Sequence, residues 1–205
     1  MPSVALQNFE SRLAEVQQLI DAHGALVRLK KAEAAHLEAA GDLSKIGNVI
    51  DALVSAPSAG KPPQVQALNG AAIALLSGHL QGFLTDLHEE AATALFEGNV
   101  QDLQAFLEVA PTRGNPNVDN INKLFASIGF LKLLDSISWK KMGNDALKKK
   151  LRGFNELRNR IAHGGGETVT KAQVENYVKV WTSLAKKLDT KIGREVKMVT
   201  GKTPW

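Results

Sequence analysis

One short stretch holds side chains whose types and spacing suit chemistry on a phosphodiester. It runs from Phe154 to Gly164 and reads FNELRNRIAHG. Histidine titrates near neutral pH and so can accept or donate a proton, while arginine offers a permanently charged, planar fork that suits phosphate. From the residues alone, a plain helix end with a Glu156–Arg160 pair and a C-terminal histidine is the simpler explanation of the stretch.

Helix geometry would place these side chains near one another at the margin of an apolar stripe. On an ideal helix Asn159 and His163 are about 40° apart, whereas Arg158 is about 140° from His163 and must reach round with its long side chain. His163 stands directly before three glycines, Gly164 to Gly166. We therefore expect His163 in the last turn, where the helix dipole favours a protonated imidazole.

The sequence lacks the residues and motifs that other kinds of catalytic site require. The chain has no cysteine, which excludes disulfides, thiolate nucleophiles and cysteine-ligated metals. Its five histidines do not fall at metal-ligand spacing on a helix, and the sequence contains neither a GxSxG elbow nor an HExxH motif. We expect neither a metal nor a cofactor.

The charge is concentrated in the second half of the chain. Residues 1–100 carry 6 basic and 11 acidic side chains, against 19 and 10 in residues 101–205. This asymmetry predicts a polyanionic partner, RNA, for the second half. A solvated, lysine-rich helix face is the alternative. The predicted RNA-binding residues are Lys148, Lys149, Lys150, Arg152 and Arg160.

Composition and hydropathy describe a globular protein. Of the 205 residues, 44% are hydrophobic and 22% charged, and this length favours one domain of ordinary size. The N-terminal residues do not form a secretory signal, and no apolar run approaches the roughly 20 residues of a membrane span. We expect a soluble, cytoplasmic protein without membrane contact.

Apolar residues recur with a helical period along the whole chain. Helices are predicted over about 3–38, 42–56, 64–97, 99–109, 118–129, 144–163 and 170–190. Asn144 is expected to cap the sixth, and Leu131, Leu133 and Leu134 to be packed. The tail from Lys191 is expected to be partly strand or disordered. The fold prediction is an all-α bundle, with residues 1–60 as an N-terminal helical arm before the proline-rich linker 57–63 and residues 61–205 as the core with a basic tail.

Three segments, in order, resemble one family. The stretch Arg158–Gly164 resembles the RNxxAHG form of the motif that marks the HEPN superfamily. The segment from Asn115-Pro116-Asn117 to Phe130 resembles the NPN…LF…iG segment of its RiboL-PSP-HEPN branch, and Ser77–Leu87 resembles an early helix of the same branch. The resemblance covers about residues 64 to 190.

The resemblance implies an all-α bundle and a metal-independent endoribonuclease of a bacterial toxin–antitoxin or phage-defence system. Such enzymes leave a 2′,3′-cyclic phosphate and a 5′-hydroxyl, and they act as homodimers in which two motifs meet. It further implies that Arg158 and His163 are catalytic, that Asn159 assists them, and that the partners are RNA and an antitoxin or another protein. Some HEPN domains do not cleave, so a non-catalytic RNA-binding or protein-interaction module is the alternative.

Overall fold

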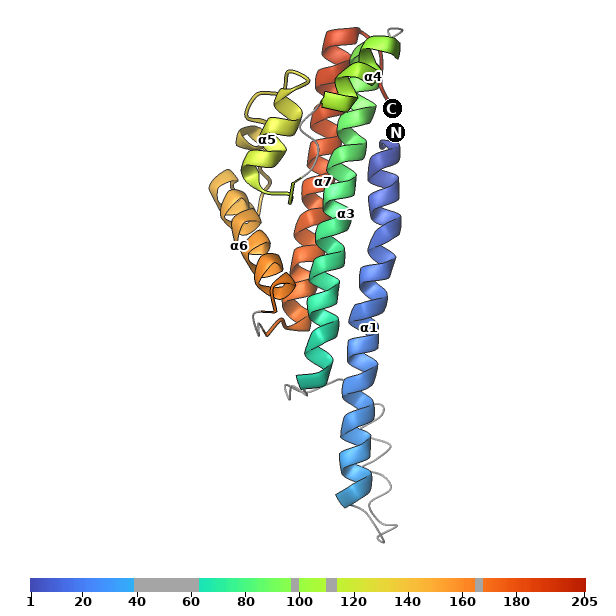
Figure 1. Cartoon of the computed structure of the whole chain (residues 1–205), viewed down its shortest axis with the longest axis vertical. Coiled ribbons are helices and arrows are strands. Elements are labelled where there is room, and N and C mark those ends of the chain that lie inside the picture. The colour runs from blue at the N-terminus through green and yellow to red at the C-terminus, as the bar shows by residue number, and fades with distance from the viewer. Residues whose placement is uncertain (39–62, 97–99, 110–113, 165–167) are drawn as a thin grey trace.

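The computed structural model of the chain describes residues 1–38, 63–96, 100–109, 114–164 and 168–205. Three long helices lie side by side: α1 (Val4–Glu38), α3 (Pro63–Phe96) and α7 (Lys171–Thr200). The shorter α5 (Val118–Ala126) and α6 (Asn144–Ala162) lie on one side of α3 and α7, and α1 lies on the other (Figure 1). Helix α4 (Val100–Val109) and the 3₁₀ helix η2 (Leu133–Ser136) complete the elements. These ranges contain no strand, so the all-α prediction is confirmed.

The start of α1 is tied to both other long helices. The Ser3 hydroxyl caps α1 by accepting a hydrogen bond from the Leu6 amide at 3.0 Å, as its position predicts. The Ser3 amide donates to Asp189 of α7 at 3.0 Å, and the Val4 and Ala5 amides donate to the Glu90 carboxylate of α3. Carboxylates from α3 and α7 thus satisfy amides that a helix start leaves unpaired.

Helix α1 also contributes to the main apolar core. One face of α1 is buried against α3 and α7, and the Phe9 and Phe83 rings lie 5.3 Å apart. The buried α1 residues of this core are Ala5, Leu6, Phe9, Val16 and Ile20. The division of the chain near residue 60 stays a prediction, and this packing shows where to test it.

Aromatic rings pack α6 against the long helices. The Phe154 ring lies 4.8 Å from Tyr177 and 5.1 Å from Trp181, both on α7. Nearer the end of α6, the Ile161 side chain lies close to Gly70 of α3. The second half of α6 therefore has a fixed position on the bundle.

Three local predictions are wrong. Gly143, not Asn144, is the N-cap of α6, because the Asn144 side chain donates instead to the carbonyls of Leu134 and Ile137. Leu133 and Leu134 are buried as expected, but Leu131 is 78% exposed, since it lies in the turn that reverses the chain after α5. The segment from Lys191 is helical to Thr200, because Ile192 and Val196 continue the buried face of α7. The helix predicted over 42–56 lies outside the described residues.

A histidine is enclosed in the core between α3, α4 and α5. The His88 ring lies 5.8 Å from both Phe106 and Phe125, and its Nε2 lies 3.0 Å from the Ser127 hydroxyl. The side chain is fully buried, and this burial lowers the pKa of His88 from 6.5 to about 4. His88 therefore stays neutral in the folded protein at pH values where the unfolded chain binds a proton.

We expect the stability of the protein to fall as the pH drops from about 6.5 to about 4. The folded-state pKa of His88 is the lower one, so its contribution is complete above the unfolded value and is lost on acidification, by up to roughly 3 kcal/mol. Urea unfolding across this range measures it. H88Q should flatten the pH dependence, whereas the control S127A, which keeps the imidazole, should retain it. An equally steep dependence in H88Q would contradict the assignment.

Candidate functional site

Helix α6 positions the motif through its apolar face. Leu147, Leu151, Phe154 and Leu157 are buried, and Ile161 is half-buried. His163 caps the C-terminus, where its amide donates to the Asn159 carbonyl at 3.0 Å, and Gly164 ends the helix with φ of 72°. A left-handed glycine in this position stops a helix. The His163 side chain is therefore exposed at the end of α6, as expected.

Asn159 links the motif to the loop before α5. Its Oδ1 accepts a hydrogen bond from Arg158 Nη1 at 3.3 Å and another from Asn115 Nδ2 at 3.1 Å. Both donors orient the amide, leaving its Nδ2 to donate elsewhere. Arg158 and Asn159 are half-buried and their side chains are in contact, whereas no direct contact joins Arg158 and His163 within the described ranges.

The loop itself is held by further asparagines. Asn117 caps α5 by accepting from the Asn120 amide at 2.7 Å, and the Asn120 side chain donates back to the Asn115 carbonyl at 3.0 Å. On the other side, Asn155 of α6 donates to the Pro116 carbonyl at 3.0 Å. The backbone around Asn115 is thus fastened to both α5 and α6.

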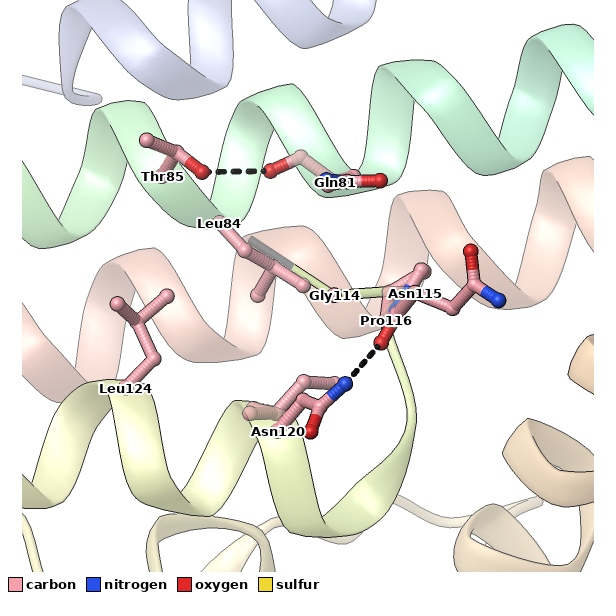
Figure 2. Close-up of a pocket in the computed structure, with 9 residues that line it drawn as sticks. Gln81, Leu84, Thr85, Gly114, Asn115, Pro116, Asn120 and Leu124 are labelled. Carbon is pink, nitrogen blue, oxygen red and sulfur yellow. Dashed lines mark hydrogen bonds between the residues drawn. The ribbon is translucent and has the colours of Figure 1, made fainter. Parts of the chain in front are cut away.

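These asparagines extend the candidate site beyond the predicted residues. Asn115, Asn120 and Asn155 are not among the residues predicted for the site, and the Asn115-Pro116-Asn117 segment is the sequence signal for this loop. A small cavity of about 20 Å³ lies beside this loop, with Gln81, Thr85 and Leu84 of α3 on its other wall (Figure 2). A Cβ on Gly114 would overlap the Asn120 amide, so glycine lets the loop lie this close to α5.

The predicted RNA-binding residues do not all share one environment. Lys148 pairs with Asp135 at 2.5 Å, and Lys150 lies over the Tyr177 ring at 5.3 Å. Lys149, Arg152 and Arg160 are exposed. Burial raises the pKa of Tyr177, and the nearby charge of Arg160 acts in the opposite direction and lowers this pKa.

Two of the predicted RNA-binding residues, Lys148 and Arg152, lie on the same face of α6 as Asn159 and His163. On an ideal helix Lys148, Arg152 and Asn159 fall within about 40° of one another, and His163 lies about 40° beyond Asn159. They lie on one face of α6, which we call the α6 track and define as Lys148, Arg152, Asn159 and His163. Lys150 points toward Tyr177 instead.

Comparison of the amino-acid sequence with known families gives one match. The model of the RiboL-PSP-HEPN family matches residues 38–194, which include the asparagine loop and all of α6. The chain belongs to the RiboL-PSP-HEPN family. This branch of the HEPN superfamily accounts for the helical bundle, whereas nearly all of α1 lies outside the matched range. No curated protein and no solved structure matches this HEPN chain.

Two further kinds of feature, metal-binding clusters and membrane-spanning helices, are absent from the described part of this HEPN chain. Nowhere in it do three or more histidine, aspartate or glutamate side chains gather in a way that could hold a metal ion. None of its described helices combines the length and apolar character of a membrane-spanning segment.

Proposed function

We propose that this HEPN protein is a metal-independent endoribonuclease. The observation that carries the proposal is the arrangement at the end of α6. Asn159 holds Arg158 in a half-buried position, and His163 stands exposed one turn further on. A fixed cation can stabilise charge on the phosphate and a solvent-accessible imidazole can transfer a proton, two of the roles that phosphodiester cleavage without a metal requires.

The proposed reaction is attack by the ribose 2′-oxygen on the adjacent phosphorus. The O2′–P bond forms while the P–O5′ bond breaks, which leaves a 2′,3′-cyclic phosphate and a 5′-hydroxyl. The 2′-hydroxyl loses one proton and the leaving O5′ gains one, and His163 can serve either transfer. Arg158 stabilises the negative charge that builds on the phosphate oxygens.

The exposed α6 cations serve RNA binding in this proposal. Charges on Arg152, Lys149 and Arg160 face solvent at the same helix as the motif, where they can pair with phosphates on either side of the cleaved bond. Lys148 and Lys150 already have partners in Asp135 and Tyr177, so we expect them to contribute less than Arg152.

A defined RNA incubated with the protein in excess chelator tests the activity. We expect cleavage to persist, with cyclic phosphate at one product end and a 5′-hydroxyl at the other. Cleavage that disappears on chelation, or products that carry a 5′-phosphate, would reject the proposed chemistry. Intact RNA that is still bound would favour the non-catalytic HEPN module instead.

We further propose that the protein acts as a homodimer. One motif supplies one histidine, whereas the reaction needs both a base and an acid, and a twofold-related copy would supply the second. The expected result is a dimer mass in light scattering at micromolar concentration. A monomer mass throughout, with cleavage intact, would contradict the composite site.

The biological setting proposed is a toxin–antitoxin or phage-defence system, with an antitoxin as protein partner. Leu26 and Leu29 of α1 are 40% and 55% exposed, and they offer an apolar surface to such a partner. The same surface is what favours the alternative, a protein-interaction module. Loss of partner binding with cleavage unchanged in L26S/L29S would separate the two functions.

A further inference from the structure

A second group of cations lies on α7, facing the segment that follows η2. They line a cavity of about 170 Å³ whose wall carries cationic and hydroxyl side chains in equal number. Pockets for whole small molecules hold about 300–1,000 Å³, so this one suits a group the size of a phosphate. The residues concerned are Lys187, Lys191, Arg194, Ser136, Ser138 and Thr190.

The cations of this cavity are incompletely neutralised. Lys187, Lys191 and Arg194 are spaced by four and three residues and therefore share one face of α7. Glu195 contacts Lys191 Nζ at 3.3 Å and Arg194 Nη2 at 3.2 Å, and these contacts lower the pKa of Glu195. One carboxylate thus faces two cations, and no ion pair joins Lys187 to another described residue. Excess positive charge remains to attract an anion.

The hydroxyl groups differ in what they can offer. Ser136 and Thr190 donate to the carbonyls of Leu133 and Lys186, both at 2.8 Å. The exposed Ser138 hydroxyl has no such bond within the described ranges, so its proton is available to a ligand. A phosphate oxygen accepts from hydroxyl and cationic donors alike.

Shared lining residues and one ion pair connect this cavity to the α6 track. A neighbouring depression shares Ser136 and Lys191 with it and is also lined by Asp135. Asp135 pairs with Lys148, the first residue of the α6 track. A chain of contacts therefore leads from the cavity to the face that carries His163.

We propose that this cavity binds a backbone phosphate of the RNA strand, distant from the bond that is cleaved. The inference rests on the proposed ribonuclease function and adds a length requirement to it. Lys148 and His163 are about 22 Å apart along α6 at 1.5 Å per residue, and the cavity lies beyond Lys148. At about 3.4 Å per nucleotide in a helical strand, an RNA must exceed roughly six nucleotides to occupy both places.

The experiment measures RNA affinity in the full-length H163A protein, which should not consume its ligand. Labelled single strands of about 20 and about 4 nucleotides are titrated at several salt concentrations. K187E/R194E reverses two charges in the cavity. K179E/K197E is the matched control, because it reverses two exposed charges on α7 outside the cavity.

We expect K187E/R194E to weaken binding of the long RNA at least tenfold more than the control does. Its salt dependence should become shallower by about one unit of log–log slope, as expected for one lost phosphate contact. Affinity for the short RNA should match the control. E195Q, which removes the countercharge and keeps the shape, should bind the long RNA several-fold more tightly. Equal weakening by both double variants, or equal effects on both RNA lengths, would overturn the proposal.

Two further arms separate this proposal from the ribonuclease itself. If the wild-type protein cleaves the long RNA but K187E/R194E does not change the affinity for it, the cavity does not bind RNA. The ribonuclease proposal would be unaffected by that result. R152E, on the α6 track, should weaken both RNA lengths if the nuclease proposal holds. Titration with AMP tests a free nucleotide as the occupant, and AMP binding that depends on Lys187 and Arg194 without any RNA length effect would reject the RNA assignment.

Discussion

H163A is expected to reduce RNA cleavage by about 10²–10⁴-fold while leaving RNA affinity nearly unchanged. The magnitude is typical of the loss of a general acid or base. His163 is exposed at the end of α6, so its truncation opens no cavity and should cost little stability. Single-turnover cleavage, a binding titration and thermal unfolding of the same preparation measure the three quantities.

R158A provides the contrast. Arg158 is half-buried and bonded to Asn159, where its charge would meet the phosphate both before and during the reaction. We expect cleavage and affinity to fall together in R158A, whereas H163A should affect cleavage alone. H163A and wild type cleaving at the same rate would reject His163 as the proton-transfer group.

F9A is expected to destabilise the whole bundle by about 3–5 kcal/mol. The Phe9 side chain is 1% exposed and contacts Phe83 of α3, and truncation of a buried phenylalanine has a cost of this size. Urea unfolding followed by helical circular dichroism measures it. L29A is the matched control on the same helix, because Leu29 is 55% exposed and its truncation should change stability by less than about 0.5 kcal/mol.

Removal of α1 tests the domain division directly. Because α1 contributes to the core, we expect a protein that lacks residues 1–38 to lose cooperative unfolding, since α3 and α7 would expose the surface that covers Phe9 and Ile20. A truncated protein that unfolds cooperatively and still cleaves RNA would instead support the predicted boundary near residue 60.

Much of the fold follows from hydrophobic period alone. In the helix predicted over 118–129, the apolar residues Val118, Ile121, Leu124 and Phe125 are all buried, because their helical spacing places them on one face that packs on the core. The end of α7 did not follow, since Lys191 and Arg194 dilute the pattern while Ile192 and Val196 stay buried. Similarly, asparagine is a typical N-cap residue, but the Asn144 side chain donates hydrogen bonds to the carbonyls of Leu134 and Ile137 instead. The sequence of the helix does not indicate these tertiary contacts.

The candidate site was predictable in part. The spacing of Asn159 and His163 on one helix is a local property that a sequence carries. The contact between Asn159 and Asn115 joins residues 44 positions apart, and neither residue type nor spacing along α6 indicates it. The orientation of Lys150 toward Tyr177 likewise depends on how α6 packs on α7.

The length of the three main helices has a hydrodynamic consequence. With 35 residues, α1 spans about 52 Å at 1.5 Å per residue, whereas a compact chain of this size has a radius of gyration of roughly 17 Å, which corresponds to a sphere about 43 Å across. Because α3 and α7 run alongside α1 (Figure 1), the described part of the chain is elongated. Its frictional coefficient will exceed that of a globular standard of equal mass, so it will elute early from a sizing column. Elution volume alone would then overstate the mass of a single chain.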